Sequence, residues 1–262
     1  MVNPNNGNLV PAVDRATDIL DYLAKNSKGT IKEIATGLHI PIASATRIIK
    51  TLTAKNYLIE HHMTPSSYSL GLKLLMFSQA VYREIDLDSI AKNEMKKLAE
   101  ETDLVSQLAI YEQGYVMYTQ MALPSPTVNV IIAPLRTPLN INTSAGGKAI
   151  ISQMPDGQMD QVLQNANLKR ATRNSITDKD LFKKHLLQCR MQGYATDDEE
   201  YSENIGCIAA PIRDHEGVTI AAVGVTGPIN IIKEHNAFER IKDLTIETAD
   251  CISHKLGYVT SK

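Results

Sequence analysis

The segment after Pro41 combines short hydroxyl side chains with basic ones, a combination that suits contact with nucleic acid. If this segment is a helix, its apolar residues form one buried stripe, and six residues remain near the outer face: Ile42, Ala43, Ser44, Thr46, Arg47 and Lys50. Short hydroxyl side chains allow close approach to the major groove, and Arg or Lys can bind guanine or phosphate. An ordinary solvated helix face has the same composition, and composition alone favours that simpler interpretation.

A second candidate is the small-residue segment Ser144-Ala145-Gly146-Gly147-Lys148-Ala149. It is not a Walker phosphate loop, because Asn142 stands where the first Gly is required and Ala149 stands where Ser or Thr binds magnesium. A turn of small residues that opens a helix leaves free backbone amides, which can bind an anion. Close packing of a helix on a sheet explains the same residues equally well, so both interpretations stay open.

Four consecutive acids, Asp197-Asp198-Glu199-Glu200, follow a predicted strand. Such a run is usually a solvated loop and sometimes a cation site, but no EF-hand spacing surrounds it. We expect Cys189 and Cys207 to be core residues rather than nucleophiles, because no histidine base stands near Cys207 in the sequence. The three cysteines and seven histidines show no metal-ligand spacing, so the sequence predicts no metal, no cofactor and no catalytic residue.

The length of 262 residues suits two domains, and 43% hydrophobic with 21% charged residues excludes wholesale disorder. No run of about 18 apolar residues could span a membrane, and the polar N-terminus is not a signal peptide. Three widely spaced cysteines are compatible with a reducing cytoplasm.

The charge is unevenly distributed along the chain. Residues 1–82 hold eight Lys/Arg against five Asp/Glu, whereas residues 83–262 hold nineteen Lys/Arg against twenty-four Asp/Glu. A mildly basic head therefore precedes an acidic body, which is compatible with nucleic-acid binding by the head.

The head pattern predicts a winged helix-turn-helix. Two helices joined by a short turn and followed by a hairpin place a wing beside the second helix, which favours the DNA interpretation. Thr30 and Glu33 form a capping-box pattern at the start of the first of these helices. We expect a disordered tail at 1–9, a DNA-binding domain at 10–71 and a linker helix at 72–83. Within the domain we expect a helix at 12–25, helices after Thr30 and Pro41, and strands at 58–62 and 68–70.

Residues 84–262 predict an α+β domain rather than a βαβ relay. Thr177 is the expected cap of a helix that runs to Gln192. The other expected helices cover 87–101, 145–153, 156–164 and 235–257, and the expected strands cover 105–111, 115–120, 128–132, 194–197, 207–213 and 220–225.

From about Leu9 to Gly257 the chain resembles the IclR-type bacterial transcriptional regulators. Each matching motif is weak alone, but their order and spacing together are specific. In the head they are Val13-Asp14-Arg15-Ala16, Ile31-Lys32-Glu33-Ile34-Ala35, Arg47-Ile48-Ile49-Lys50-Thr51-Leu52 and Tyr68-Ser69-Leu70-Gly71. In the body they are Gly147-Lys148-Ala149, Gly193-Tyr194-Ala195, Asp197-Asp198-Glu199-Glu200, Gly206-Cys207-Ile208-Ala209-Ala210-Pro211-Ile212 and Gly227-Pro228.

The resemblance implies a winged helix-turn-helix head, a linker helix and a C-terminal GAF-like effector domain with an antiparallel sheet flanked by helices. It also implies homodimers, often paired into tetramers, that bind double-stranded DNA at an inverted-repeat operator, and a small effector, commonly an organic acid or aromatic compound. The predicted DNA contacts are Thr30 and the six outer-face residues after Pro41. Carried over by position, the effector residues are Ser144, Ala145, Gly146, Asp197, Cys207, Gly224 and Thr226.

Two positions depart from the family pattern. Ala43 stands where recognition helices often carry Ser. Gly224 stands where some members carry a Ser, which predicts more room in the effector site and one hydroxyl fewer.

From the residues and the resemblance together, we predict a cytoplasmic, ligand-responsive DNA-binding regulator, in this family most often a repressor, and not an enzyme. Two alternatives stay open: an enzyme or scavenger that uses a pocket around Asp197 and Cys207, and an effector-free DNA-architectural protein whose body is filled with side chains.

Overall fold

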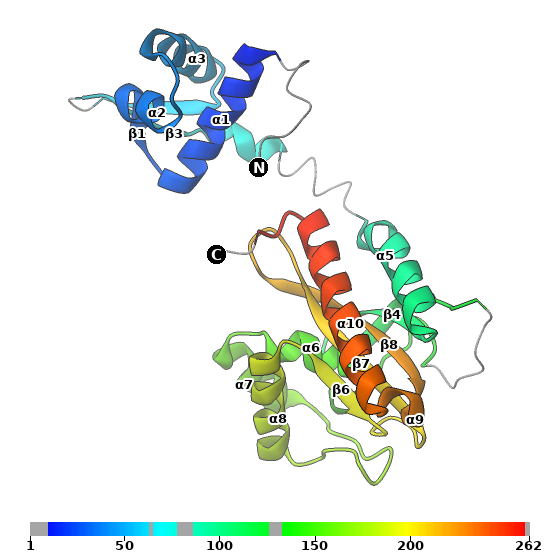
Figure 1. Cartoon of the computed structure of the whole chain (residues 1–262). Helices are drawn as coiled ribbons and strands as arrows, with labels where there is room; N and C mark the ends of the chain where they lie inside the picture. Colours follow the sequence, from blue (N-terminus) through cyan, green and yellow to red (C-terminus); the bar gives the residue numbers. More distant parts are fainter. Residues whose placement is uncertain (1–9, 63–64, 78–85, 126–132, 260–262) are drawn as a thin grey trace. The chain divides into compact units, whose positions relative to one another are not determined.

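The computed structural model describes residues 10–62, 65–77, 86–125 and 133–259 (Figure 1). The chain divides into two compact units, Met1–Ile85 and Asp86–Lys262, called here the head and the body. The predicted tail at 1–9, the strand at 128–132 and the linker-helix residues 78–83 lie outside the described residues.

The head is a winged helix-turn-helix, as the sequence predicts. Its elements are α1 (Pro11–Asn26), β1 (Gly29–Thr30), α2 (Ile31–Gly37), α3 (Ile42–Ala54), β2 (Leu58–His61) and β3 (Ser67–Leu70). The strands form an antiparallel sheet in the order β1-β3-β2. Strand β1 was not predicted, because two residues are too few to show an alternating pattern.

Apolar residues from α1, α2 and α3 meet in one core of the head. Ile19 and Leu23 of α1, Ile34 of α2 and Ile49 of α3 are almost completely buried there. At the start of α2 the predicted capping box is confirmed, because Glu33 N donates to Thr30 Oγ1 at 3.2 Å and Thr30 N donates to Glu33 Oε2 at 2.8 Å. The turn and both helices that carry the predicted DNA contacts are therefore held by local bonds and by burial.

Residues 73–77 are helical and pack on the head. Lys73 Nζ donates to the carbonyl of Lys55 at 3.1 Å and lies 4.6 Å from the centre of the Tyr57 ring. The Phe77 ring stacks on Tyr57 with 5.8 Å between ring centres. The described start of the expected linker helix thus continues from the wing as part of the head.

The body is built on a five-stranded antiparallel sheet in the order β5-β4-β8-β7-β6. Figure 1 shows α5 and α10 on one face of this sheet and α6, backed by α8, on the other, in agreement with their packing contacts. The first elements are α5 (Leu87–Thr102), β4 (Val105–Glu112), β5 (Tyr115–Ala122), the short 3-10 helix η1 (Ile141–Thr143) and α6 (Ala145–Ser152). They are followed by α7 (Asp156–Asn165), α8 (Lys179–Gln192), β6 (Ala195–Asp198), β7 (Ile205–Arg213), β8 (Thr219–Pro228), α9 (Ile229–Ile232) and α10 (His235–Lys255).

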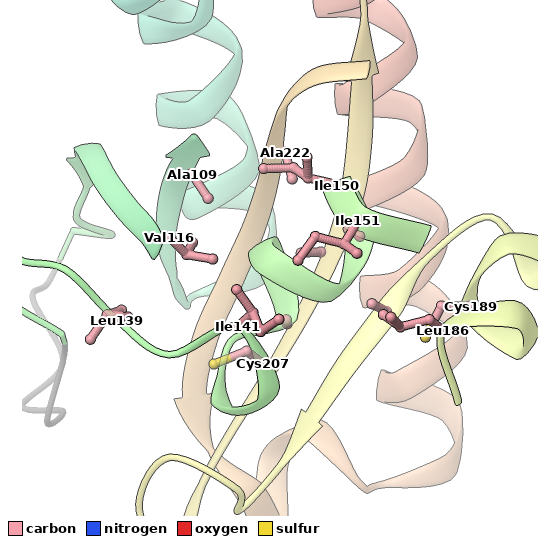
Figure 2. Close-up of a cluster of buried hydrophobic side chains, with 14 of the residues drawn as sticks. Ala109, Val116, Leu139, Ile141, Ile150, Ile151, Leu186, Cys189, Cys207 and Ala222 are labelled. Atoms are coloured by element: carbon pink, nitrogen blue, oxygen red, sulfur yellow. The ribbon is translucent and has the colours of Figure 1, made fainter. Parts of the chain in front are cut away.

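A core of the body lies between the sheet and α6 to α8. Figure 2 shows Ile150 and Ile151 of α6 among residues of the sheet, with Leu186 and Cys189 of α8 in the same cluster. Cys207 of β7 belongs to this core too, so the expectation that Cys189 and Cys207 are buried is confirmed. The α+β class and the antiparallel sheet flanked by helices are also as predicted.

The predicted cap of α8 is wrong by one residue. Asp178 is the N-cap, because its Oδ1 accepts from Leu181 N at 2.8 Å. The Thr177 hydroxyl instead accepts from Arg170 Nη2 at 3.3 Å. Both residue types cap helices well, so sequence alone could not choose between neighbours.

Candidate DNA interface and effector site

The outer face of α3 presents a basic surface. Arg47 and Lys50 are exposed, as are Ile42 and Ala43, while Ala45 and Ile49 on the opposite side are completely buried. This arrangement follows from the helical repeat, which separates the apolar stripe from the basic side chains. The exposed face is free to enter a groove of DNA without disturbing the core.

The three hydroxyl side chains predicted to contact DNA differ in how free they are. Thr46 Oγ1 donates to the Ile42 carbonyl at 2.8 Å, and the Thr30 hydroxyl is engaged in the capping box. Ser44 is half-buried and lines a groove of about 560 Å³ between α1 and α3, together with Arg47 and Arg15. Two guanidinium groups therefore border one groove of the head, which favours an anionic partner.

In the body, strand register places three of the predicted effector residues in one row across the sheet. Asp197 of β6 pairs with Cys207 of β7, which pairs with Thr226 of β8. On the next strand Gln107 of β4 pairs with Gly224. Side chains on the same face of neighbouring strands come within contact distance, so residues more than a hundred positions apart form a single site.

A chain of hydrogen bonds connects this row. Cys207 Sγ lies 3.2 Å from Thr226 Oγ1, which donates to Gln107 Oε1 at 2.7 Å. Cys207 Sγ also lies 3.8 Å from Asp197 Oδ2. Burial, with the nearby Asp197 carboxylate, raises the pKa of Cys207 well above its ordinary value. The side chain is therefore a thiol rather than a thiolate, which does not suit a nucleophile.

Two of the four consecutive acids point inward. Asp197 is 3% and Glu200 is 4% exposed, whereas Asp198 is exposed and pairs with Lys233 at 2.6 Å. Asp197 Oδ1 accepts from the backbone amides of Glu200 at 2.7 Å and Tyr201 at 3.3 Å, which holds the turn after β6. Burial raises the pKa of Asp197. Within the described ranges, no group of three or more His, Cys, Asp or Glu side chains could hold a metal ion.

Lys148 of α6 forms a buried ion pair with Glu200. Lys148 is 0% exposed and the Glu200 side chain 6%. Burial raises the pKa of Glu200 to about 7, while the Lys148 charge opposes the rise. This ion pair ties α6 to the turn after β6, so it joins the two walls of the site.

The start of α6 has features of both interpretations of its sequence, close packing on the sheet and free amides that can bind an anion. A Cβ on Gly146 would lie 2.6 Å from Ala109 Cβ, and one on Gly147 would lie 2.4 Å from Val116 Cγ2, so both glycines serve close packing on the sheet. Ser144 caps the helix by accepting from Gly147 N at 3.2 Å, and its hydroxyl lies 3.1 Å from the Tyr118 hydroxyl. Gly147 N and Lys148 N are thus paired, while the amides of Ala145 and Gly146, which no helical carbonyl can reach, remain for a ligand.

Two small cavities of about 10 Å³ each lie in this region. The helix-side cavity is bordered by Ala145, Gly146 and Gly224, and the loop-side cavity by Asp197, Tyr201 and Leu139. Both are bordered by Gln107, Tyr118, Cys207 and Thr226. Such a volume holds about one water molecule, so side chains nearly fill the site in this conformation.

The extra room expected at Gly224 does not exist. A Cβ there would lie 2.4 Å from the Ile208 carbonyl oxygen and 2.8 Å from Ala209 Cβ. The missing side chain is needed for close approach of β7 and β8, so Gly224 shapes the sheet rather than widening the site.

Comparison with known proteins decides the family. The model of the bacterial transcriptional regulator IclR C-terminal domain matches residues 79–254, and the model of the IclR helix-turn-helix domain matches residues 12–60. The chain belongs to the IclR family. It is therefore a DNA-binding transcriptional regulator with a C-terminal ligand-binding domain, and not an enzyme.

Individual relatives agree with this assignment. The chain is 30% identical over 219 residues to the HTH-type transcriptional regulator BhcR of Paracoccus denitrificans, covering 84% of this chain and 78% of BhcR. It is 26% identical over 247 residues to the HTH-type transcriptional repressor AllR of Escherichia coli K12, covering 94% and 90%. The crystal structure of Thermotoga maritima IclR is similar with a TM-score of 0.63 and 26% identity, covering 95% of this chain and 99% of that one. Among the described helices, none has the length and apolar character needed to cross a membrane.

Of the seven effector residues predicted in this IclR-family chain, six border the two cavities. Ser144 borders neither cavity and reaches the site through its contact with Tyr118. Four further residues belong to the site and were not among the predicted effector residues: Gln107, Tyr118, Lys148 and Glu200. One signal for Gln107 was present, because Ser106 and Gln107 are adjacent polar residues between apolar Val105 and the apolar run Leu108-Ala109-Ile110.

Proposed function

We propose that this chain is a cytoplasmic repressor that binds an inverted-repeat operator as a homodimer, or as a dimer of dimers, and responds to a small carboxylate-bearing metabolite. The effector would be held by Ser144, Ala145, Gly146, Asp197, Cys207, Gly224 and Thr226. The observation that carries this proposal is the row of buried polar side chains on the sheet, which faces the amide-rich start of α6.

The chemistry of the site supports an effector with both an acceptor and a donor. The amides of Ala145 and Gly146 border the helix-side cavity and carry the partial positive charge of a helix N-terminus, which favours a carboxylate. Asp197 Oδ2 is the acceptor of the opposite wall. An ionised Asp197 repels a carboxylate, so the ligand would place its carboxylate at α6 and a hydroxyl at Asp197.

The small volume of the cavities suggests how a ligand could change DNA affinity. A metabolite larger than a water molecule fits only after the site widens. A ligand that binds only the widened state shifts the population toward it, by an amount equal to its differential affinity. If the two states hold the DNA-binding heads differently, operator affinity changes by the same coupling energy.

The head supports operator binding through α3. Arg47 and Lys50 lie on its exposed face, together with Ile42, Ala43, Ser44 and Thr46, while Thr30 stands at the start of α2. Two such heads related by a two-fold axis would contact half-sites about 34 Å apart, one turn of DNA, or a multiple of that spacing. Footprinting on an operator selected from random-sequence DNA should therefore show an inverted repeat, and a single asymmetric half-site per dimer would contradict the proposal.

The effector part is tested with the full chain by fluorescence anisotropy on the selected operator. A panel of small organic acids and aromatic acids should contain compounds that release the DNA. Asp197→Asn keeps the side-chain shape and removes the charge, and Asp198→Asn is the matched control on the exposed side of the same strand. We expect Asp197→Asn alone to alter the effector response: a weaker response to hydroxylated acids identifies an acceptor, and a stronger response to simple carboxylates identifies a repulsive filter.

A second candidate, an effector-free DNA-architectural protein, is favoured by one observation, the near-complete filling of the site by side chains. It predicts that no panel compound binds the chain or changes its operator affinity. That result would replace the effector proposal while leaving the DNA-binding part intact.

A further inference from the structure

Gln107 is a buried polar residue with one half of its amide unpaired. Its side chain is 3% exposed, and it borders both the helix-side and the loop-side cavity. Gln107 Oε1 accepts from Thr226, but Nε2 has no hydrogen-bond partner among the described residues. Buried amide groups in folded proteins are nearly always paired, so an unpaired one at a ligand cavity calls for a partner.

The orientation of the amide follows from its neighbours. Cys207 has a raised pKa and therefore keeps its one proton, which it can donate to Thr226 Oγ1 at 3.2 Å or to Asp197 Oδ2 at 3.8 Å. The Thr226 proton then goes to Gln107 Oε1. Because Gln107 Oε1 is the atom that accepts from Thr226, the two hydrogens on Gln107 Nε2 are left for a group that enters the cavity.

We propose that Gln107 is a specificity-determining residue of the effector site, and that its Nε2 donates to a carboxylate or carbonyl oxygen of the ligand. The proposal rests on the effector function proposed above and narrows it. A ligand in the loop-side cavity meets the Gln107 donor and the Asp197 Oδ2 acceptor. The matching chemistry is a small hydroxy acid, with one acceptor oxygen and one hydroxyl.

Ser106 offers a matched control. It is the neighbour of Gln107 on β4, it is fully buried, and its hydroxyl also lacks a partner among the described residues. Successive side chains of a strand point to opposite faces, and Ser106 borders neither cavity. Ser106→Ala therefore shows the effect of losing an unpaired polar group from β4, whereas a Gln107 variant also loses the proposed ligand contact.

The experiment is calorimetric titration of the full chain with glycolate and lactate and with their primary amides, glycolamide and lactamide. We expect Gln107→Leu to weaken binding of the hydroxy acid by roughly 10- to 150-fold, the range for a hydrogen bond to a charged group. Ser106→Ala should leave the affinity unchanged. If Gln107→Leu does not fold, the unbranched Gln107→Met replaces it.

Gln107→Glu provides a readout that a purely structural role would not move. An ionised glutamate still accepts from Thr226, but it cannot donate and it repels a carboxylate. We therefore expect this variant to prefer the hydroxy amide over the hydroxy acid, the reverse of the wild-type preference. Reversal of the preference supports direct contact.

Three results would overturn the inference. The first is that Gln107→Leu binds the hydroxy acid as tightly as the wild type does. The second is that Ser106→Ala weakens binding as much as Gln107→Leu does. The third is that the wild type binds none of the four probes. The last result overturns only the hydroxy-acid inference, because the effector function itself is decided by the broader panel of acids.

Discussion

The buried ion pair of Lys148 and Glu200 predicts a specific pH dependence of stability. Lys148→Met removes the cation from a site where it is completely buried and leaves the Glu200 carboxyl with similar packing around it. Removing one partner of a buried pair costs about 3–5 kcal/mol, because the remaining charge is uncompensated. The variant can avoid much of this cost by protonating Glu200, so the loss of stability must depend on pH.

The sign follows from proton binding. Burial raises the pKa of Glu200 from 4.5 to about 7, so between these pH values the folded chain binds more protons than the unfolded chain. Stability therefore falls as pH rises from 4.5 to 7, by at most about 1.4 kcal/mol per pH unit for this group, and then levels off. Without the Lys148 charge, which lowers the Glu200 pKa, the fall continues above pH 7. At pH 8.5 the gap between wild type and variant should exceed the gap at pH 6 by up to about 2 kcal/mol.

Urea unfolding of the full chain, followed by circular dichroism between pH 5 and 9, measures this gap. The double variant Lys148→Met with Glu200→Gln is the control, because it has no carboxyl to protonate at that position, and we expect the extra fall above pH 7 to disappear. A gap between wild type and Lys148→Met that stays constant from pH 6 to 8.5 would refute the assignment of the effect to Glu200.

Three further predictions concern the head and the sheet. Arg47→Ala should lose about 1–3 kcal/mol of specific operator affinity with an unchanged melting temperature. Lys25→Ala, which removes the same charge at the end of α1, is the control and should keep its operator affinity. Equal losses of affinity in anisotropy titrations of the two variants would show that Arg47 is not a specific contact. Thr30→Ala should lower the unfolding free energy of the head by about 0.5–2 kcal/mol in denaturant titration, because it breaks the capping box, and no loss would mean that the cap is dispensable. Gly224→Ser should lower the unfolding free energy of the body by about 1–3 kcal/mol, because its Cβ meets the Ile208 carbonyl; a stable variant would show that β7 and β8 can separate at that point.

The head could be predicted almost completely from its sequence because its structure is dominated by local signals. Apolar residues at helical spacing define α1 and α3, and the Thr30–Glu33 box defines the start of α2 within four residues of chain. The failures were also local in origin. In the head, β1 has only two residues; in the body, Thr177 and Asp178 are neighbouring residues that can both cap a helix.

The effector site could be predicted only in part, because its contacts depend on sheet order. β4 and β8 are neighbours in the sheet, which brings Gln107 within 2.7 Å of Thr226 across 119 positions of sequence. The Lys148–Glu200 pair likewise joins residues 52 positions apart. Family resemblance supplied Asp197, Cys207 and Thr226 by position, but nothing in a single sequence states which strand lies next to which.

The four acids after β6 show how neighbouring residues of one chemical type acquire different roles. Strand alternation turns Asp197 inward and Asp198 outward, where Asp198 pairs with Lys233. The turn that follows ends the alternation, because Asp197 itself accepts the amide of Glu200 and so directs the Glu200 side chain back to Lys148. The buried carboxylate of Asp197 thus does two things: Oδ1 holds the turn that positions the ion pair, and Oδ2 accepts from Cys207 Sγ beside the loop-side cavity. A site that used Asp197 only for ligand binding would leave Oδ1 unpaired, so the same bonds that stabilise the fold also limit the ligand to one oxygen of this carboxylate.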